Sequence, residues 1–248
     1  MEPVIRTSGL RKRYRGAENE ALRGIDLEVE PGEFFGLLGP NAAGKSTLIS
    51  ILCGIIGHSS GTVEVFGKRL NHRSNEFKRK IGLIPQEIAL YPTLSVLENL
   101  RYFGHLHGFS GQELKHRIRE YIRLFNLEEH VHKPINKCSG GIRRRVNLIA
   151  GIIHGPDLIL LDEPTLGVDP QLRGLIFDTL VELNRAGATL IYTTHYMMEA
   201  ETLCNRVSII DHGTILMEGE PKGLIASTPG CQDLGQLFIK LTGRDLRD

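Results

Sequence analysis

The nine residues 39–47, "GPNAAGKST", constrain this chain more than any other stretch of its sequence. They follow the apolar run "FFGLL", typical of a buried strand, and lead into "KSTLISILCG", which has helical length. Gly39, Gly44, Lys45 and Ser46 match the phosphate-loop pattern in the strand–loop–helix setting that it requires. The sequence therefore predicts a nucleotide site along the loop, which consists of Gly39, Pro40, Asn41, Ala42, Ala43, Gly44, Lys45, Ser46 and Thr47.

The chemistry of such a loop explains its composition. Backbone N–H groups surround the β-phosphate, and the N-terminus of the following helix adds partial positive charge. Lys45 is expected to reach the β- and γ-phosphates, and the Ser46 hydroxyl to ligate Mg²⁺. The loop thus predicts a nucleoside triphosphate bound with Mg²⁺.

A second motif, "LILLDEPT", places two acids directly after four apolar residues. A phosphate-loop Mg²⁺ site needs a carboxylate at the end of a neighbouring strand, and Asp162 is placed to hold the metal, mostly through water. Glu163 is placed to polarise a water for attack on the γ-phosphate. The alternative interpretation is that both acids simply end a strand.

The composition is that of an ordinary globular chain. Its 248 residues are 41% hydrophobic, and the net charge of +1 gives no reason to expect nucleic acid as a general partner. The first residues lack the apolar core of a signal peptide, and no apolar stretch has the length of a membrane-spanning helix. The four scattered cysteines form no C-x-x-C pair, so a reducing cytosol is expected, and the ten histidines show no metal-ligand spacing.

The order of elements predicts an α/β fold. The first 30 residues suggest short strands, and residues 95–154 carry apolar residues at the three- and four-residue spacings of amphipathic helices. Apolar strands then alternate with helices, which indicates a parallel sheet covered on both faces. The expected strands are 157–162, 188–194 and 206–211, with helices at 170–185 and 196–204 and a last amphipathic helix within 233–248.

A third motif joins the first two. Ser139, Gly140 and Gly141 open a helix, where free N–H groups form an anion site, 23 residues before Asp162. The combination of the three motifs resembles the ATP-binding cassette (ABC) ATPases over essentially the whole chain. In that family this signature caps the γ-phosphate held by the phosphate loop of the other subunit.

The resemblance assigns roles to four further residues. Tyr14, in "RKRY", matches the aromatic residue that stacks on adenine, and Gln86, in "IGLIPQ", matches the glutamine that approaches Mg²⁺ and water. Asp169, in "LGVDP", fits the loop that crosses the dimer seam. His195, in "IYTTH", fits the switch histidine that contacts the γ-phosphate. Alone, each of these residues would have an ordinary structural interpretation.

The resemblance also implies an architecture. It is a P-loop NTPase (RecA-like) core with a mainly parallel sheet, an N-terminal antiparallel β-subdomain and an inserted α-helical subdomain. The expected parts are a core with the β-subdomain at about 1–86 and 157–225, a helical subdomain at about 87–156, and a helical tail at 226–248. It further implies a head-to-tail dimer, of two copies or with a second ABC ATPase, with two ATP molecules at the seam.

The chain departs from the family pattern at two positions. Ala42 replaces the usual glycine, and it adds roughly 1 kcal/mol of strain if its φ is positive. Ile142 replaces the glutamine that usually ends the signature, which puts any contact of that glutamine with the partner in doubt. The three arginines 143–145 after it favour a solvated helix face, and "SGGIRRR" resembles the drug-, polysaccharide- and antibiotic-exporting branch.

Three functions are compatible with these motifs. The first is the ATPase subunit of an exporter, cytoplasmic and held at the inner face of the cell membrane by a separate permease; export rather than import rests on branch resemblance alone. The second is a soluble ABC ATPase that acts on DNA, ribosomes or cofactor assembly, although the chain has neither a long coiled coil nor a second cassette. The third is a regulator that no longer hydrolyses ATP, against which Glu163 and His195 both argue. The transported substrate stays open.

Overall fold

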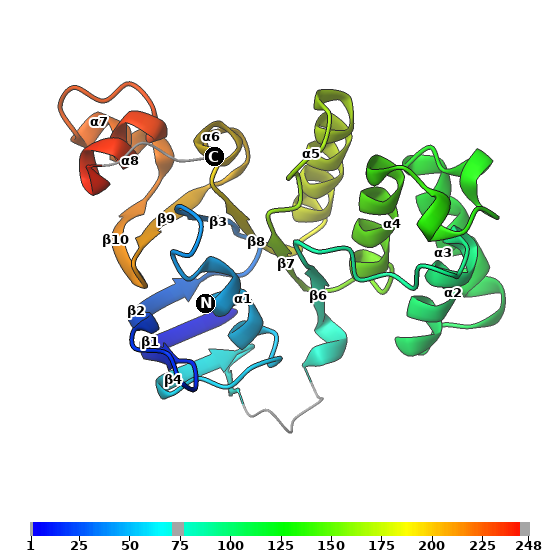
Figure 1. The fold of residues 1–248 in the computed structure, drawn as a ribbon, viewed down its shortest axis with the longest axis horizontal. Helices are drawn as coiled ribbons and strands as arrows, with labels where there is room; N and C mark the ends of the chain where they lie inside the picture. Colours follow the sequence, from blue (N-terminus) through cyan, green and yellow to red (C-terminus); the bar gives the residue numbers. More distant parts are fainter. Residues whose placement is uncertain (1, 71–76, 244–248) are drawn as a thin grey trace.

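An antiparallel sheet and a mainly parallel sheet form the framework of the molecule (Figure 1). The computed structural model describes residues 2–70 and 77–243. The smaller sheet has the order β2-β1-β4-β5 and all of its pairings are antiparallel. Its strands are β1 (Ile5–Arg13), β2 (Glu20–Val29), β4 (Ser60–Val65) and β5 (Lys68–Arg69).

The larger sheet has the strand order β10-β9-β3-β8-β7-β6 and is parallel except for the outer strand β10. Every residue of the strands β3, β7 and β8 is buried, as expected for parallel strands covered on both faces. The carboxyl ends of these neighbouring parallel strands meet at one edge of the sheet. The six strands are β3 (Phe34–Leu38), β6 (Ile81–Ile84), β7 (Leu158–Asp162), β8 (Thr189–Thr194), β9 (Arg206–Asp211) and β10 (Thr214–Gly219).

Five helices accompany the larger sheet in the described part of the chain. The helix α1 packs between the two sheets within a cluster that joins Leu37 of β3 to Leu48 of α1 and to Ile25 of β2. The other four follow β7 or later strands, and α7 and α8 pack on each other and on α6. They are α1 (Lys45–Leu52), α5 (Pro170–Arg185), α6 (Met197–Leu203), α7 (Pro221–Ser227) and α8 (Leu234–Thr242).

A helical region lies at one end of the molecule, on the right of Figure 1. It contains α2 (Val96–Leu106), α3 (Gly111–Leu124) and α4 (Gly140–Ile152), with short 3₁₀ turns at Lys78–Lys80, Glu128–His130 and Ile135–Lys137. A capping box of Ser95 and Glu98 starts α2. The buried stripe Leu114, Ile118 and Ile122 of α3 explains the amphipathic pattern, because it packs in the core beside α2 and α4.

These elements confirm the expected α/β fold, and residues 170–185 form a helix with the expected bounds. The strand β10 and the helix α7 were not expected. The last five residues of the expected tail, 244–248, lie outside the described residues. In the described ranges, no helix is both long enough and apolar enough to cross a bilayer.

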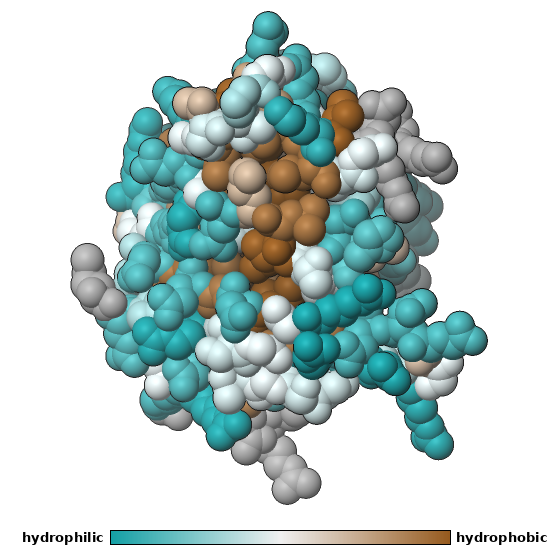
Figure 2. Space-filling model, turned by 90° about the vertical axis from the view of Figure 1, so that its left-hand side faces the viewer, coloured by the Kyte–Doolittle hydropathy of each residue, from teal (hydrophilic) through white to brown (hydrophobic). Residues whose placement is uncertain are grey.

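The side of the molecule that carries β10, α7 and α8 has an apolar surface. Figure 2 shows a strip of hydrophobic side chains that crosses this side between more polar borders. Exposed apolar residues on these elements include Leu216 of β10 and Ile239 of α8.

Candidate active site

A cavity of about 450 Å³ opens beside the segment 39–47, at the edge where β3 and β7 end. Backbone and side chains of the loop form most of its wall, and Gln86 and Glu163 approach from other segments. The lining residues are Ala21, Asn41, Ala42, Ala43, Gly44, Lys45, Ser46, Thr47, Gln86 and Glu163.

The backbone of the loop explains its small residues. A Cβ atom on Gly39 would lie 2.2 Å from the carbonyl oxygen of Ile210, so this position can only be glycine. Gly44 has a φ of 111°, in the left-handed region that glycine adopts without strain. Ala42 has a φ of 65°, the positive value for which strain was expected at this alanine. The strain costs about 1 kcal/mol.

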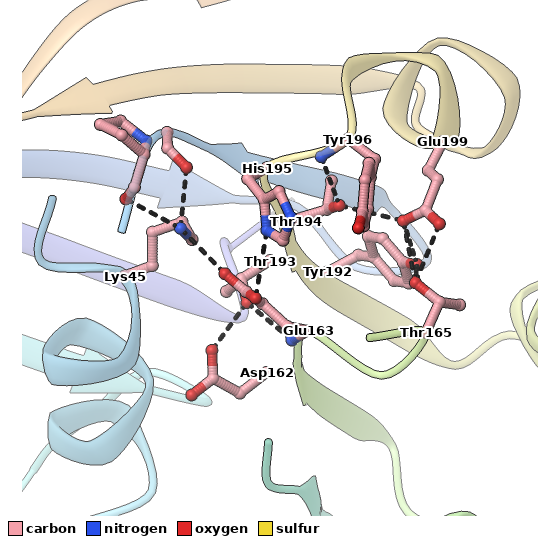
Figure 3. Close-up of polar contacts among 12 residues, drawn as sticks. Lys45, Asp162, Glu163, Thr165, Tyr192, Thr193, Thr194, His195, Tyr196 and Glu199 are labelled. Carbon is pink, nitrogen blue, oxygen red and sulfur yellow. Dashed lines mark hydrogen bonds and ion pairs between the residues drawn. The ribbon is translucent and has the colours of Figure 1, made fainter. Parts of the chain in front are cut away.

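Lys45 is the buried cation of the site, with 4% of its surface exposed. Its Nζ donates hydrogen bonds to the carbonyl oxygens of Gly39 at 2.8 Å and Pro40 at 3.0 Å. The same Nζ lies 3.1 Å from Oε1 of Glu163, which is itself only 6% exposed (Figure 3). The loop and the end of β7 are therefore joined by a buried ion pair.

Glu163 occupies a strained position between two basic groups. Its φ of 47° is uncommon for a residue with a side chain, and such strain concentrates at functional sites. While Oε1 faces Lys45, Oε2 lies 3.2 Å from Nδ1 of His195 (Figure 3). The structure thus brings three sequence-predicted site residues, from three separate segments, into contact.

Thr193 fixes the two acids after β7. Its Oγ1 donates to Oδ1 of Asp162 at 2.8 Å and accepts from the backbone N–H of Glu163 at 3.0 Å. One hydroxyl therefore sets the direction of the Asp162 carboxylate and the position of the Glu163 backbone. Sequence reasoning missed this residue, because it is one of two threonines at the end of a buried strand.

Tyr14 lies at the border of the phosphate loop. Its hydroxyl is 3.2 Å from Oγ1 of Thr47, and 44% of the residue is exposed. Nζ of Lys12 lies 5.1 Å from the ring centroid, within the range of a cation–π contact. The structure therefore brings Tyr14 to the loop, with much of its surface open.

The signature residues lie elsewhere on the chain. Ser139 begins α4, where its Oγ accepts from the N–H of Ile142 at 3.4 Å, and Asp169 begins α5, where Oδ1 accepts from the N–H of Leu172 at 2.9 Å. A Cβ on Gly141 would lie 3.3 Å from the side chain of Leu172, so the two helix starts are neighbours. In the part of the chain that the structure describes, neither these starts nor Gly140 line the cavity beside the phosphate loop.

The expectation of a solvated arginine face at 143–145 was wrong for its middle residue. Arg144 is only 5% exposed and donates to the carbonyl oxygens of Pro85, Gln86 and Glu163 at 3.2, 2.8 and 2.9 Å. The physical reason is that α4 is covered on both sides, since eight of the ten residues 143–152 are buried. Ile142 is buried in the core of the helical region.

The comparisons with known proteins agree with this geometry. Residues 22–166, more than half of the chain, match the family described as "ABC transporter". The chain belongs to the ABC transporter family. It is therefore an ATP-binding and ATP-hydrolysing subunit of a transport system, as the resemblance implied.

Two relatives of this ABC ATPase illustrate its place in the family. It is 42% identical to the linearmycin resistance ATP-binding protein LnrL of Bacillus subtilis, over 96% of this chain and 75% of that protein. It is 40% identical to the Nod factor export ATP-binding protein I of Cupriavidus metallidurans, over 93% of this chain and 76% of that protein.

Solved structures of ABC cassettes share its fold. An ATP-binding subunit of an ABC transporter aligns with a TM-score of 0.88 at 27% identity, covering 96% of this chain and 99% of that one. A dimeric ATP-binding cassette in a post-hydrolysis state, bound to ADP and Pi, aligns with a TM-score of 0.80 at 28% identity. That alignment covers 87% of this chain and 98% of the other.

Proposed function

We propose that two copies of this ABC ATPase pair head to tail and power an exporter whose membrane-spanning part is a separate permease. The observation that supports this pairing is the separation of the two sets of site residues. The phosphate loop, Glu163 and His195 form one half of a site, whereas Ser139 and Asp169 begin helices outside that cavity. In a head-to-tail pair, each half is completed by the other copy. The related cassette bound to ADP and Pi is a dimer.

The residues that line the cavity, together with Tyr14 and Asp162 outside its lining, fit ATP with Mg²⁺. The loop supplies N–H groups and Lys45 to the phosphates, and Tyr14 presents an open ring for adenine. Ser46, Gln86 and Asp162 supply hydroxyl, amide and carboxylate oxygens, the hard ligands that Mg²⁺ prefers. The metal, when bound, neutralises charge on the β- and γ-phosphates.

The hydrolytic step falls to residues of this chain. Glu163 accepts a proton from the attacking water as the γ-phosphoryl group is transferred. His195, in contact with Oε2 of Glu163, contacts the γ-phosphate and orients that carboxylate. Lys45 exchanges its pairing with Glu163 for the phosphates, which frees the carboxylate for the water. Gly140 and Gly141 of the second copy bind the γ-phosphate from the opposite side, next to Ser139.

A second cavity could receive apolar side chains from a short helix of the permease. It has a volume of about 190 Å³ and lies between β6, α2 and α4, directly after the strand that leads to Gln86. Its wall includes Leu83, Phe103 and Leu106, and the last of these is 67% exposed. An apolar groove of this shape binds an amphipathic helix by its apolar face. Arg144 connects the groove to the active site, because it donates to the carbonyl oxygens of both Gln86 and Glu163.

The direction and location of transport are inferred from the relatives. Their names describe export of Nod factor and resistance to linearmycin, and both fit an exporter. The chain would then lie at the inner face of the membrane, held there by the permease. We divide it into a core with the β-subdomain at about 1–86 and 157–225, a helical subdomain at about 87–156, and the tail after residue 225.

Membrane flotation tests the permease part of this proposal. The chain is co-expressed with a candidate permease, and its recovery with membranes is measured. We expect Leu106→Asp to lose most of that recovery while it keeps ATP binding. Leu124→Asp is the matched control, since Leu124 is an exposed leucine on α3 outside the groove. Equal recovery of both variants would contradict permease docking at this groove.

A further inference from the structure

Behind the active site lies a buried carboxylate that none of the family motifs includes. Glu199 of α6 is 3% exposed and accepts three hydroxyl hydrogen bonds (Figure 3). Oγ1 of Thr165 lies 2.9 and 3.0 Å from its two oxygens, and the hydroxyls of Tyr192 and Thr194 lie 2.8 and 2.9 Å from Oε2. We call these four residues the Glu199 network.

The network joins segments that are far apart in the sequence. Thr165 lies two residues after Glu163, and Thr194 lies directly before His195. Oγ1 of Thr194 also accepts from the N–H of Tyr196 at 2.9 Å, so both neighbours of His195 are tied to one hydroxyl. Glu199 therefore binds the backbone segments next to Glu163 and next to His195, the two residues that contact each other.

A fifth group extends the network toward the second copy. Nε of Arg173, on the first turn of α5, lies 3.6 Å from Oε1 of Glu199, and its guanidinium lies over the ring of Tyr196 at 5.6 Å. The ring of Tyr196 is 4.1 Å from that of His195. Asp169, which begins the same helix α5, belongs to the segment proposed to meet the other copy. One carboxylate thus connects that helix start to the switch histidine.

Stability alone gives a weak reason for such a carboxylate. Burying a charge costs free energy, and a well-packed apolar side chain of similar size is often neutral or stabilising in its place. Here the cost is offset by donors in fixed positions, since charge-assisted hydrogen bonds are short and directional. Burial raises the pKa of the Tyr192 phenol, with the Glu199 carboxylate as the second cause, so that the phenol remains a donor at neutral pH.

We propose that Glu199 is a positioning residue for ATP hydrolysis, which fixes the turn after Glu163 relative to the loop that carries His195. This rests on the proposed roles of Glu163 and His195. Glu199 does not contact the nucleotide in this arrangement; it acts through the two residues that do. When its carboxylate is neutral or absent, Glu163 and His195 lose their fixed relation, and the attacking water is held in the wrong place.

Steady-state ATPase kinetics of Glu199→Gln test the proposal. We expect kcat to fall about tenfold or more while the KM for ATP changes less than threefold. The reason is that losing an interaction made in the transition state lowers kcat without weakening substrate binding. Glu201→Gln is the matched control: Glu201 lies on the same helix but accepts from the N–H of Leu234, away from the active site. Unchanged kcat in a folded Glu199→Gln protein would overturn the proposal.

A double-mutant cycle separates positioning from a purely structural role. If Glu199 acts by fixing His195 relative to Glu163, Glu199→Gln should lower turnover several-fold less in the His195→Ala background than in wild type. Additive losses would mean that Glu199 acts independently of His195 and would overturn the proposal. Thr194→Val, which removes one hydroxyl of the network, serves the same cycle if Glu199→Gln fails to fold. An inactive wild-type chain would instead refute the proposed ATPase site itself.

Discussion

Nζ of Lys45 lies 3.1 Å from Oε1 of Glu163, and both side chains are almost completely buried. The residue proposed to bind the phosphates is therefore paired with the residue proposed to activate the water. Because Oε2 of the same carboxylate contacts His195, Glu163 is held between two partners before any phosphate competes for Lys45. The proposal therefore predicts that ATP binding and the release of the Glu163 carboxylate from Lys45 are coupled.

Glu163→Gln should separate binding from turnover. The amide cannot accept a proton from water, so we expect kcat for ATP hydrolysis to fall by a factor of about 10² to 10⁴. Gln also pairs more weakly with Lys45, so the affinity for ATP should be unchanged or a few-fold tighter. Equilibrium binding of a fluorescent ATP analogue and steady-state phosphate release measure the two effects. Turnover that equals wild type would refute the role of Glu163.

Ala42→Gly should change little, in spite of the positive φ of Ala42. Glycine relieves about 1 kcal/mol of backbone strain but adds roughly as much conformational entropy to the unfolded chain. We expect the free energy of unfolding to change by less than about 1 kcal/mol and the ATP affinity by less than fivefold. Denaturant unfolding and nucleotide titration provide the two values. An ATP affinity that changes by orders of magnitude would show that the side chain of Ala42 matters for nucleotide binding.

Arg144→Met should destabilise the chain by about 2–4 kcal/mol, because three carbonyl oxygens lose a charged donor in a buried setting. Arg144→Lys should recover only part of this loss, since an ammonium cannot reproduce the guanidinium fork. Arg143→Met is the matched control on the same helix; Arg143 is exposed, and its replacement should stay within about 0.5 kcal/mol. Equal unfolding midpoints for the substitutions at 143 and 144 would argue against a stabilising role for the buried hydrogen bonds of Arg144.

The histidine pair in the groove predicts acid sensitivity. The pKa of His154 is lowered to about 4, with burial as the largest cause; the ring of His107, stacked at 3.7 Å, and Arg117 act in the same direction, while the hydrogen bond to Ile81 opposes the shift. An unfolded histidine has a pKa near 6.5. Below that pH the unfolded chain binds a proton at this residue that the folded chain does not, so stability falls as the pH drops from about 6.5 toward 4.

His154→Gln should reduce this pH dependence. Glutamine does not titrate, and its amide can still donate to the carbonyl oxygen of Ile81. We expect the free energy of unfolding of the variant to fall less than that of wild type between pH 7.5 and 5. Denaturant unfolding curves at the two pH values give the change in the free energy of unfolding for each protein. A loss of stability that is the same at both pH values reports altered packing instead. Parallel slopes would rule out His154 as a source of the sensitivity.

The sequence predicts the fold well where structure follows local pattern. The strands β3 and β7 are mainly apolar runs between turn residues, and β8 has the apolar centre "LIY", which suffices to identify buried parallel strands. The outer strand β10 was missed, because an antiparallel edge strand with mixed exposure has no continuous apolar run. The short helix α7 has only seven residues, too few for a clear helical period.

Some residues of the site could be predicted from the sequence and others could not. The phosphate loop was found because its residues are contiguous and their spacing is dictated by the phosphates. Thr193, Arg144 and Glu199 could not be assigned, because each has partners on other elements, 19 to 59 residues away along the chain. For Arg144 one signal was present: the apolar run "VNLIAGII" after it indicates a helix buried on all sides.

The central claim is that a second copy completes each ATP site, and the mass of Glu163→Gln in solution tests it most directly. Size exclusion with light scattering is run in ATP and in ADP. With ATP we expect about twice the chain mass of 27.6 kDa, and with ADP a single chain. Adding Ser139→Arg to this variant should keep it single in ATP, because the signature face is then blocked. A Glu163→Gln protein that binds ATP and still elutes as a single chain would contradict the composite site.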